Sequence, residues 1–448
     1  MTFACTFLLM FASREFVIPA MNLQAKNGNL DGDPQVYSDI GLLKAQEMKV
    51  SGLSQFQLRP GGFGPAGAAS LSYYYFDSVY GVVVLNAFLH SIMVVSIFSI
   101  LSMWFGLLAS ASAIILVFFS PYMMVWFSQV NKDSYVAAGS LLLIFSVLKM
   151  LKQVKDFPPA KNNNQYNNFF KFFLIAAFGV LLIALVRPYI NKINFMLFAS
   201  WYLVTICSKV YRKSISYNLC FILILVCMML TTRGSSSDET IESFRNYTNG
   251  TNNVKFESTI IYEKCLNNIS MQTWENNFFV DFINANMKAM SGQRCLIFTI
   301  LSNQKNNVTL DSVLDYDILP RSTLEALAYA PRAALLGIFA PWPDRWLYVF
   351  ENRFSTFYII APIEAFLMYV GLLALGFFVY LRRIEKLDIV FPFFISFGVM
   401  SFYGFSTPYL GALYRYRYPW WMLVVSMGLA ALVQLIIIYC KRSATITK

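Results

Sequence analysis

The acidic residues that could do chemistry in this sequence stand beside its apolar segments. Asp33 lies in the run GDPQVY (residues 32–37), within a polar stretch after the first apolar segment, and Asp133 follows Lys132 just before another. Two such carboxylates could position an acceptor hydroxyl, remove its proton, or hold a divalent cation such as Mg²⁺ or Mn²⁺. Each also has a structural interpretation, Asp33 as an Asx-turn residue before a proline and Asp133 as a helix-capping acid.

The basic residues with the most distinctive context are Arg415 and Arg417, in the run YRYRYP (residues 414–419). A guanidinium group is a fixed cation whose fork of donors matches phosphate oxygens. Arginines flanked by tyrosines at a bilayer surface would suit a lipid-linked phosphate, although aromatic and basic residues also anchor helices at the interface. Arg187 and Arg332, each beside a proline, are further candidates for the same role.

The composition indicates a membrane protein. The 448 residues are 57% hydrophobic and only 13% charged, whereas soluble domains carry about 25% charged residues. The net charge of +11 does not indicate nucleic-acid binding, because most basic residues lie in short stretches beside apolar segments. Neither the cysteines nor His90 have the spacing of a zinc or haem site, and Cys265 and Cys295 in a polar stretch could form a disulfide.

Apolar runs of membrane-spanning length predict an all-α, polytopic protein with about ten transmembrane helices. We expect a membrane domain (1–230) with a first extracytoplasmic loop (21–79), an extracytoplasmic polar loop domain (231–354) between the seventh and eighth spans, and C-terminal membrane helices (355–448). The expected spans cover about residues 2–20, 80–101, 107–119, 135–151, 169–186, 193–208, 217–230, 357–381, 389–405 and 420–439.

Positive charge predicts which face of the membrane each loop occupies. Clusters of lysine and arginine follow the fourth, sixth, eighth and tenth expected spans, and they fall on one side if the spans alternate. That side is expected to be cytoplasmic and to carry both termini. The first loop, the segment around Lys132 and Asp133, the polar loop and the segment around Arg415 then share the outer face.

The stretch from residue 28 to residue 69 resembles the first extracytoplasmic loop of the GT-C superfamily of membrane glycosyltransferases. The resemblance is closest to the bacterial branch of protein-mannosyltransferase-like and lipid A glycosyltransferase-like enzymes. Gly32, Asp33, Tyr37 and Ala45 precede the Pro-Gly pair at 60–61 in the order that the family shows.

Two further segments are similar to family features. The family often carries an acidic residue after a proline-led segment at the membrane end, and residues 121–133 have that layout, although Lys132-Asp133 stands where glutamate is commoner. The family also often shows Arg-Tyr-Arg before a proline near the last spans, as at 415–419. The resemblance covers roughly the first 150 residues and the last 40.

The resemblance implies an inverting glycosyltransferase that moves a sugar from a polyprenyl-phosphate carrier to a hydroxyl of a glycan, lipid or protein acceptor. The reaction would take place at the outer face of a bacterial cytoplasmic membrane and need no nucleotide. Asp33 would be the catalytic base or a metal ligand, with Asp133 as the second catalytic or metal-binding acid. The substrate-binding residues expected with them are Tyr37, Lys132, Arg187, Arg332, Arg415 and Arg417.

Two other functions compete with this one. An O-antigen or polysaccharide polymerase or ligase would also have many spans, one large outer loop and functional arginines, but it has no need of the loop at 21–79. A lipid-linked sugar flippase or transporter is less favoured, because the expected spans contain few ionisable residues and no repeat relates the two halves.

Overall fold

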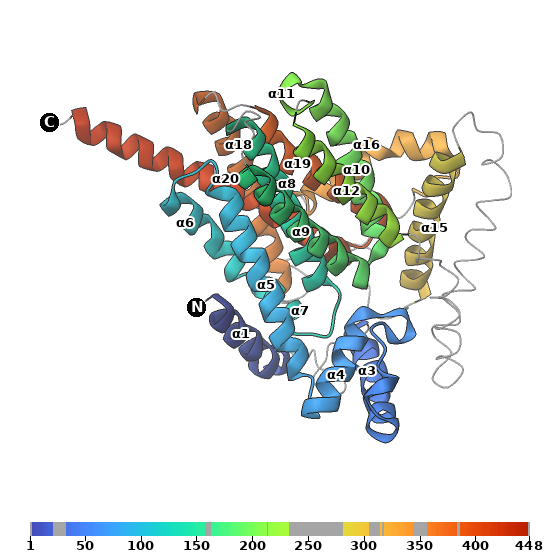
Figure 1. Ribbon diagram of the computed structural model, residues 1–448. Helices are drawn as coiled ribbons and strands as arrows, with labels where there is room; N and C mark the ends of the chain where they lie inside the picture. The colour runs from blue at the N-terminus through green and yellow to red at the C-terminus, as the bar shows by residue number, and fades with distance from the viewer. Residues whose placement is uncertain are drawn as a thin grey trace. The chain divides into compact units, whose positions relative to one another are not determined.

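A computed structural model describes most of the chain as helix. The described residues are 2–20, 33–156, 163–212, 214–232, 281–303, 314–315, 318–343, 356–382 and 386–446, and among them there is no β-strand. Eight helices within this part are long and apolar enough to cross a membrane, so the chain is a helical membrane protein. They are α5 (Tyr80–Leu101), α8 (Asp133–Asp156), α9 (Asn163–Val186), α10 (Pro188–Cys207), α12 (Ile215–Thr232), α18 (Thr356–Arg382), α19 (Lys386–Ser406) and α20 (Leu410–Ile446) (Figure 1).

Two of the expected spans are present as shorter helices. The first is divided into α1 (Thr2–Ala12), a π-helical turn η1 (Ser13–Val17) and α2 (Ile18–Ala20). The third is α6 (Leu107–Phe118), which has 12 residues. At 1.5 Å per residue it is about 18 Å long, against a hydrocarbon core of about 30 Å. Ten spans therefore remain a prediction, and eight candidates are observed.

The last helix differs from its expected start. We expected the final span to begin near residue 420, with residues 414–419 before it at the membrane surface. Instead, α20 begins at Leu410 and contains Pro419. The YRYRYP run is thus helical. The polar segment also contains helices, α15 (Asp281–Asn303) and α16 (Thr323–Phe339). Ser322 caps α16 by accepting a hydrogen bond from the Glu325 amide. Cys295 in α15 is disulfide-bonded, and Cys265 lies outside the described residues.

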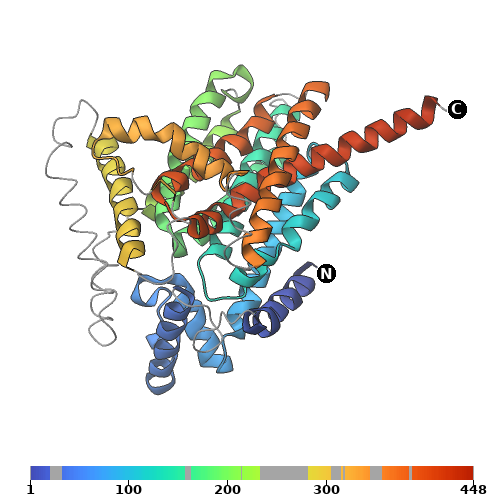
Figure 2. The same ribbon diagram turned by 180° about the vertical axis from the view of Figure 1, so that it is seen from behind.

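The chain divides into two compact units. The first comprises residues 1–240, 367–395 and 422–448, and the second comprises residues 241–366 and 396–421. In the first unit α8 packs along both α9 and α5, and α9 continues the layer to α12, which packs against α10 (Figures 1 and 2).

The crossing of α8 and α9 depends on two glycines. A Cβ atom added to Gly139 would lie 2.6 Å from the carbonyl oxygen of Gly179, and the reverse distance is the same. Small residues at such crossings let membrane helices approach closely and pack by van der Waals contact. This close contact fixes the position of the first half of α8 relative to the second half of α9.

In the first unit, one acid contacts side chains from two other helices. Asp388, in the first turn of α19, accepts hydrogen bonds from Lys155 of α8 (3.2 Å) and from the hydroxyl of Tyr211 (3.4 Å), in the short helix α11 (Lys209–Arg212). The basic segments after the fourth and sixth expected spans therefore lie next to the start of the ninth. This agrees with the prediction that these segments share one side of the membrane. The side of the membrane that they face remains a prediction.

We expect Gly139→Ala to destabilise the protein by about 1–3 kcal/mol, the usual cost of overpacking, despite the better helix propensity of alanine. The midpoint of thermal unfolding of the purified protein in detergent measures this. Gly376→Ala, in α18, is the matched control, because an added Cβ there meets no atom within 4 Å. Equal midpoints for the two variants would contradict the close crossing.

Candidate functional site

The residues Lys132 and Asp133 lie where the chain enters α8. The preceding helix α7 (Pro121–Phe127) ends in a short non-helical segment, residues 128–132. Asn131 then caps α8, because its Oδ1 accepts a hydrogen bond from the Asp133 amide at 3.0 Å. An acid in the first helical turn is also favoured by the helix dipole, so the capping interpretation of Asp133 is compatible with its position.

Asp133 forms a buried ion pair with Arg187. The distance from Arg187 Nη2 to Asp133 Oδ1 is 2.9 Å, and the two side chains are only 6% and 4% exposed. Arg187 is available there because it lies between α9 and α10, where Pro188 begins the next helix. Both residues are among the predicted site residues, and the structure brings them into contact.

The Lys132 ammonium group lies over two aromatic rings from the first loop. Its Nζ is 4.9 Å from the ring centroid of Tyr37 and 4.8 Å from that of Phe63, and the two centroids are 5.0 Å apart. Such cation–π contacts are worth about 0.5–2 kcal/mol. Phe63 was not predicted as a site residue, although its position after the Pro-Gly-Gly turn was visible in the sequence.

The described part of the first loop, residues 33–79, contains a helical hairpin that packs on the end of α9. Its helices α3 (Asp33–Ser51) and α4 (Gly64–Phe76) are joined by a turn in which Gly61 and Gly62 adopt positive φ, a conformation that favours glycine. Ser38 and Tyr73 link α3 to α4 by a hydroxyl–hydroxyl hydrogen bond of 2.6 Å. Gly64 lies so close to the Leu185 carbonyl that a Cβ atom would clash with it. The hairpin therefore contacts the chain two residues before Arg187.

Asp33 is the first residue of α3 and is exposed. Tyr37 follows four residues later, one turn along the same helix face, and it contacts Lys132. Four of the predicted residues are thus joined by contacts: Tyr37, Lys132, Asp133 and Arg187. Asp33 adds a carboxylate that solvent can reach at the same end of the hairpin.

The two acids differ too much in environment to form a metal site together. Asp133 is buried with its carboxylate on Arg187, and a guanidinium cation so close disfavours a second cation. Among the described residues no group of three His, Cys, Asp or Glu side chains could hold a metal ion. The pair Asp33 and Asp133 therefore does not fit a shared divalent cation.

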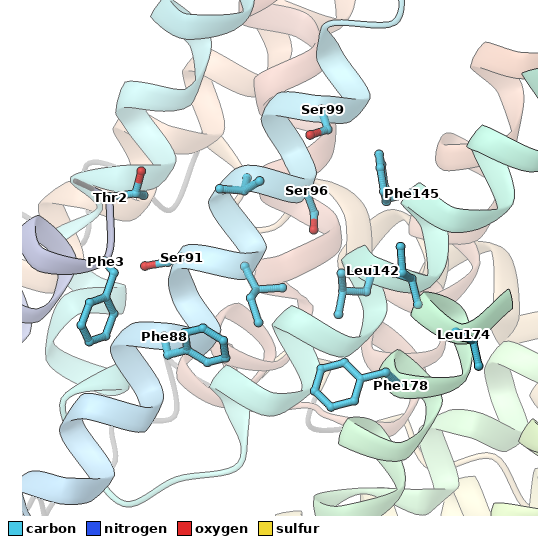
Figure 3. Close-up of a pocket in the computed structure, with 13 residues that line it drawn as sticks. Thr2, Phe3, Phe88, Ser91, Ser96, Ser99, Leu142, Phe145, Leu174 and Phe178 are labelled. Atoms are coloured by element: carbon cyan, nitrogen blue, oxygen red, sulfur yellow. The ribbon is translucent and has the colours of Figure 1, made fainter. Parts of the chain in front are cut away.

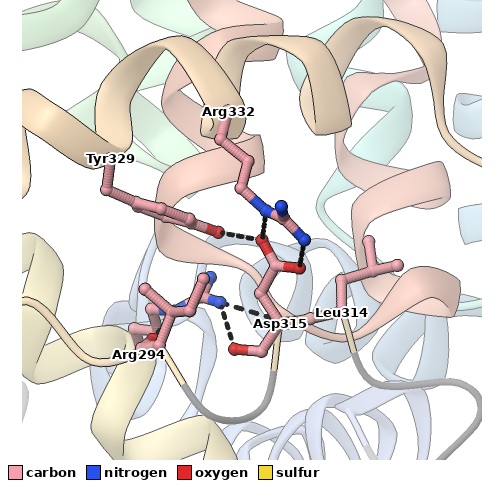
Figure 4. A network of polar contacts seen from close by, with 6 residues as sticks. Arg294, Leu314, Asp315, Tyr329 and Arg332 are labelled. Carbon is pink, nitrogen blue, oxygen red and sulfur yellow. Dashed lines mark hydrogen bonds and ion pairs between the residues drawn. The ribbon is translucent and has the colours of Figure 1, made fainter.

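The predicted residue Arg332 lies in the second unit and belongs to a different network. Its Nε and Nη2 donate to the two carboxylate oxygens of Asp315 at 2.7 and 2.6 Å, and the Tyr329 hydroxyl donates to Asp315 at 3.1 Å (Figure 4). Arg294 is fully buried and donates to the carbonyls of Leu314 and Asp315 at 3.1 and 2.8 Å. This network fixes the short segment before α16.

The charges in this network set the pKa of Asp315. Burial alone would raise it, but hydrogen bonds from Arg332 and Tyr329 and the charges of Arg332 and Arg294 together hold the pKa of Asp315 below its ordinary value. Burial raises the pKa of the Tyr329 hydroxyl. Asp315 is therefore an ionised structural partner, and nothing in the sequence marked it.

The arginines of the YRYRYP run have unequal surroundings. Arg417 is 0% exposed, and it donates to the carbonyls of Gly337 (2.8 Å) and Ala340. A phosphate on Arg417 would have to compete with these acceptors. Arg415 is half-buried and donates to the Tyr416 hydroxyl at 3.2 Å. Phosphate binding by either residue stays a prediction.

An apolar groove of about 720 Å³ runs along α5 in the first unit (Figure 3). Its walls come from α1, α5, α8 and α9. One of its serine hydroxyls is already bonded, since Ser91 donates to the Ala87 carbonyl of its own helix at 2.8 Å. The lining residues are Thr2, Phe3, Phe88, Ser91, Ile92, Val95, Ser96, Ser99, Leu142, Phe145, Leu174, Ile175 and Phe178.

None of the protein-family models, curated proteins and solved structures compared with this chain matches it.

We expect Arg187→Met to destabilise the protein by about 3–5 kcal/mol, because it leaves the buried Asp133 carboxylate without its cation. Adding Asp133→Asn to Arg187→Met removes the unpaired charge and should recover part of the loss. The free energy of unfolding in mixed detergent micelles measures both changes. Lys49→Met is the control, since its pair with Asp77 is exposed and should be worth under about 1 kcal/mol. If Arg187→Met lowers the free energy of unfolding by no more than the control does, Asp133 and Arg187 do not form a buried ion pair.

Proposed function

We propose that this protein is a membrane glycosyltransferase that moves a sugar from a polyprenyl-phosphate carrier to a hydroxyl of a glycan, lipid or protein acceptor. The observation that carries the proposal is the grouping in the first unit. Asp33 and Tyr37 lie on one turn of α3, and Tyr37 contacts the Lys132 that precedes the buried Asp133–Arg187 pair. The loop that resembles the GT-C enzymes thus supplies an exposed acid beside a cationic end of the membrane helices.

The proposed reaction is a single displacement. The acceptor oxygen attacks the anomeric carbon, the bond from that carbon to the phosphate oxygen breaks, and the hydroxyl proton passes to the Asp33 carboxylate. The configuration inverts, and the carrier phosphate leaves with the bonding electron pair. The role of Lys132 is to offset the charge that grows on this phosphate, with Arg187 contributing positive potential and Asp133 fixing the arginine in place.

The apolar groove supports a carrier with a long hydrocarbon tail. Leu142 on α8 and Phe178 on α9 line the groove, and each lies about 13 Å along its helix from Asp133 or Arg187 at 1.5 Å per residue. A lipid whose phosphate is bound at this end of α8 and α9 could therefore lay its tail in the groove. The active face would be the outer face of a bacterial cytoplasmic membrane.

We expect Asp33→Asn to lower the rate of sugar transfer by at least about 100-fold, since a general base contributes about 10²–10⁴. Transfer of radiolabelled sugar from polyprenyl phosphate in a membrane extract measures it, at matched amounts of folded protein. Asp39→Asn is the control, because Asp39 is a half-buried acid of the same helix and bonds Gln35. The transfer rate of Asp39→Asn should stay within about twofold of the wild-type rate.

Two results would count against this proposal. Equal transfer by wild type and Asp33→Asn would leave Asp33 with only a structural role at the start of α3 and would favour the polysaccharide polymerase or ligase. Absence of transfer by the wild type, with polyprenyl-phosphate sugar crossing the membrane in its presence, would favour the flippase or transporter.

We expect Ile92→Trp, which fills the groove, to raise the KM for a full-length polyprenyl-phosphate sugar by about tenfold, equivalent to about 1.4 kcal/mol. The KM for a donor with two isoprene units should not change, because its tail is too short to reach the substitution. Val84→Trp is the control, since Val84 is an exposed residue of α5 outside the groove. An equal rise in KM for both donors would show that the tail does not bind in the groove.

A further inference from the structure

The segment that delivers Lys132 and Asp133 is buried although it is not helical. Ser128, Gln129 and Asn131 are all shielded from solvent. Non-helical backbone at membrane depth is tolerated only where protein groups or water satisfy its amides and carbonyls. The bonding partners of this segment therefore decide where the site residues lie.

Two side chains from other helices satisfy three successive carbonyls of this segment. The Asn86 Nδ2 of α5 donates to the carbonyls of Phe127 (2.9 Å) and Gln129 (2.8 Å). The Arg14 Nη1 of the π-helical turn donates to the carbonyl of Ser128 between them, at 3.0 Å. Both donors come from segments that precede α7 in the chain, so they tie the entry of α8 to α5 and to the first helix.

Asn86 also bonds the far side of the site residues. Its Oδ1 accepts a hydrogen bond of 2.8 Å from the hydroxyl of Ser134, the residue after Asp133. One amide group therefore holds the chain both before Lys132 and after Asp133. A shift of the segment relative to α5 would have to break all three of its hydrogen bonds.

Arg14 reaches the segment from the π-helical turn η1. Residues 13–17 contain one extra residue in the turn, and Arg14 is 3% exposed while its neighbour Glu15 is exposed and bonds the Tyr80 hydroxyl. A cation in an apolar helix is costly and marks a functional position. Hydrogen bonding to a carbonyl that has no helical partner offsets that cost.

We propose that Arg14 and Asn86 are positioning residues of the transferase site, which hold Lys132 and Asp133 in register with Arg187 and the first loop. The inference rests on the proposed function and extends it to two residues that touch neither substrate nor reacting atoms. A displacement of about 1 Å at reacting groups can cost about 100-fold in rate. Loss of either donor should therefore lower kcat far more than it raises KM.

The test compares Asn86→Leu with Asn218→Leu at matched amounts of folded protein. Asn218 of α12 has the same bonding pattern, since its amide donates to the carbonyls of Tyr211 and Arg212 and accepts from the hydroxyl of Tyr202. Two readouts are measured, the kinetics of sugar transfer and the hydrogen–deuterium exchange of peptides covering residues 125–136. If Asn86→Leu does not fold, Arg14→Met, which removes the donor to the Ser128 carbonyl, takes the place of Asn86→Leu in the test.

We expect Asn86→Leu to lower kcat about 10–100-fold, with the donor KM within about twofold, and to speed exchange in residues 125–136. Asn218→Leu should change neither readout. Unchanged exchange in the Asn86 variant overturns the inference whether or not the protein is a transferase. Faster exchange with unchanged kcat overturns it too, while the proposed function stands. A wild type without transfer defeats the proposed function, and the exchange result alone then decides whether these residues hold the segment.

Discussion

The first unit depends on the bonding of backbone that is buried among apolar helices without being helical. Lipid offers no hydrogen-bond partner, so each carbonyl of residues 127–129 needs a donor from the protein. Asn86 and Arg14 provide the donors. The same constraint fixes the start of α8, and with it the pairing of Asp133 with Arg187 and the contact of Lys132 with the rings of Tyr37 and Phe63.

Five arginines in the described part of the chain have structural partners. Arg14, Arg294 and Arg417 are buried and donate to main-chain carbonyls, while Arg187 and Arg332 are paired with acids. Because three of these cations are buried against neutral carbonyls, part of the net charge of +11 is not accessible to an anionic substrate. The fork of donors on a guanidinium group suits it to bind several carbonyls where chain segments end within or beside membrane helices.

Hydropathy predicted the membrane class and the bounds of α5, because a lipid-facing helix must be apolar along its length. The start of α20 was missed, because the run around Arg417 looks interfacial until its carbonyl acceptors are known. For the site, residue type and helix ends pointed to Asp133 and Arg187, but their contact needed the fold. Asn86 was missed because a single asparagine in an apolar run does not reveal which segment its side chain contacts. Asp315 was missed because its partners lie on separate elements.

The proposed function requires that a polyprenyl phosphate binds where the first loop meets the start of α8. A polyprenyl phosphate with a photoreactive diazirine next to the phosphate tests it directly, by mass spectrometric mapping of labelled peptides from membranes. We expect labelling of peptides that contain residues 33–37, 59–66 or 131–133. An excess of non-photoreactive polyprenyl phosphate should abolish this labelling, and polyprenol should not. Labelling confined to the peptide around Arg415, or labelling that polyprenol competes equally well, would contradict it.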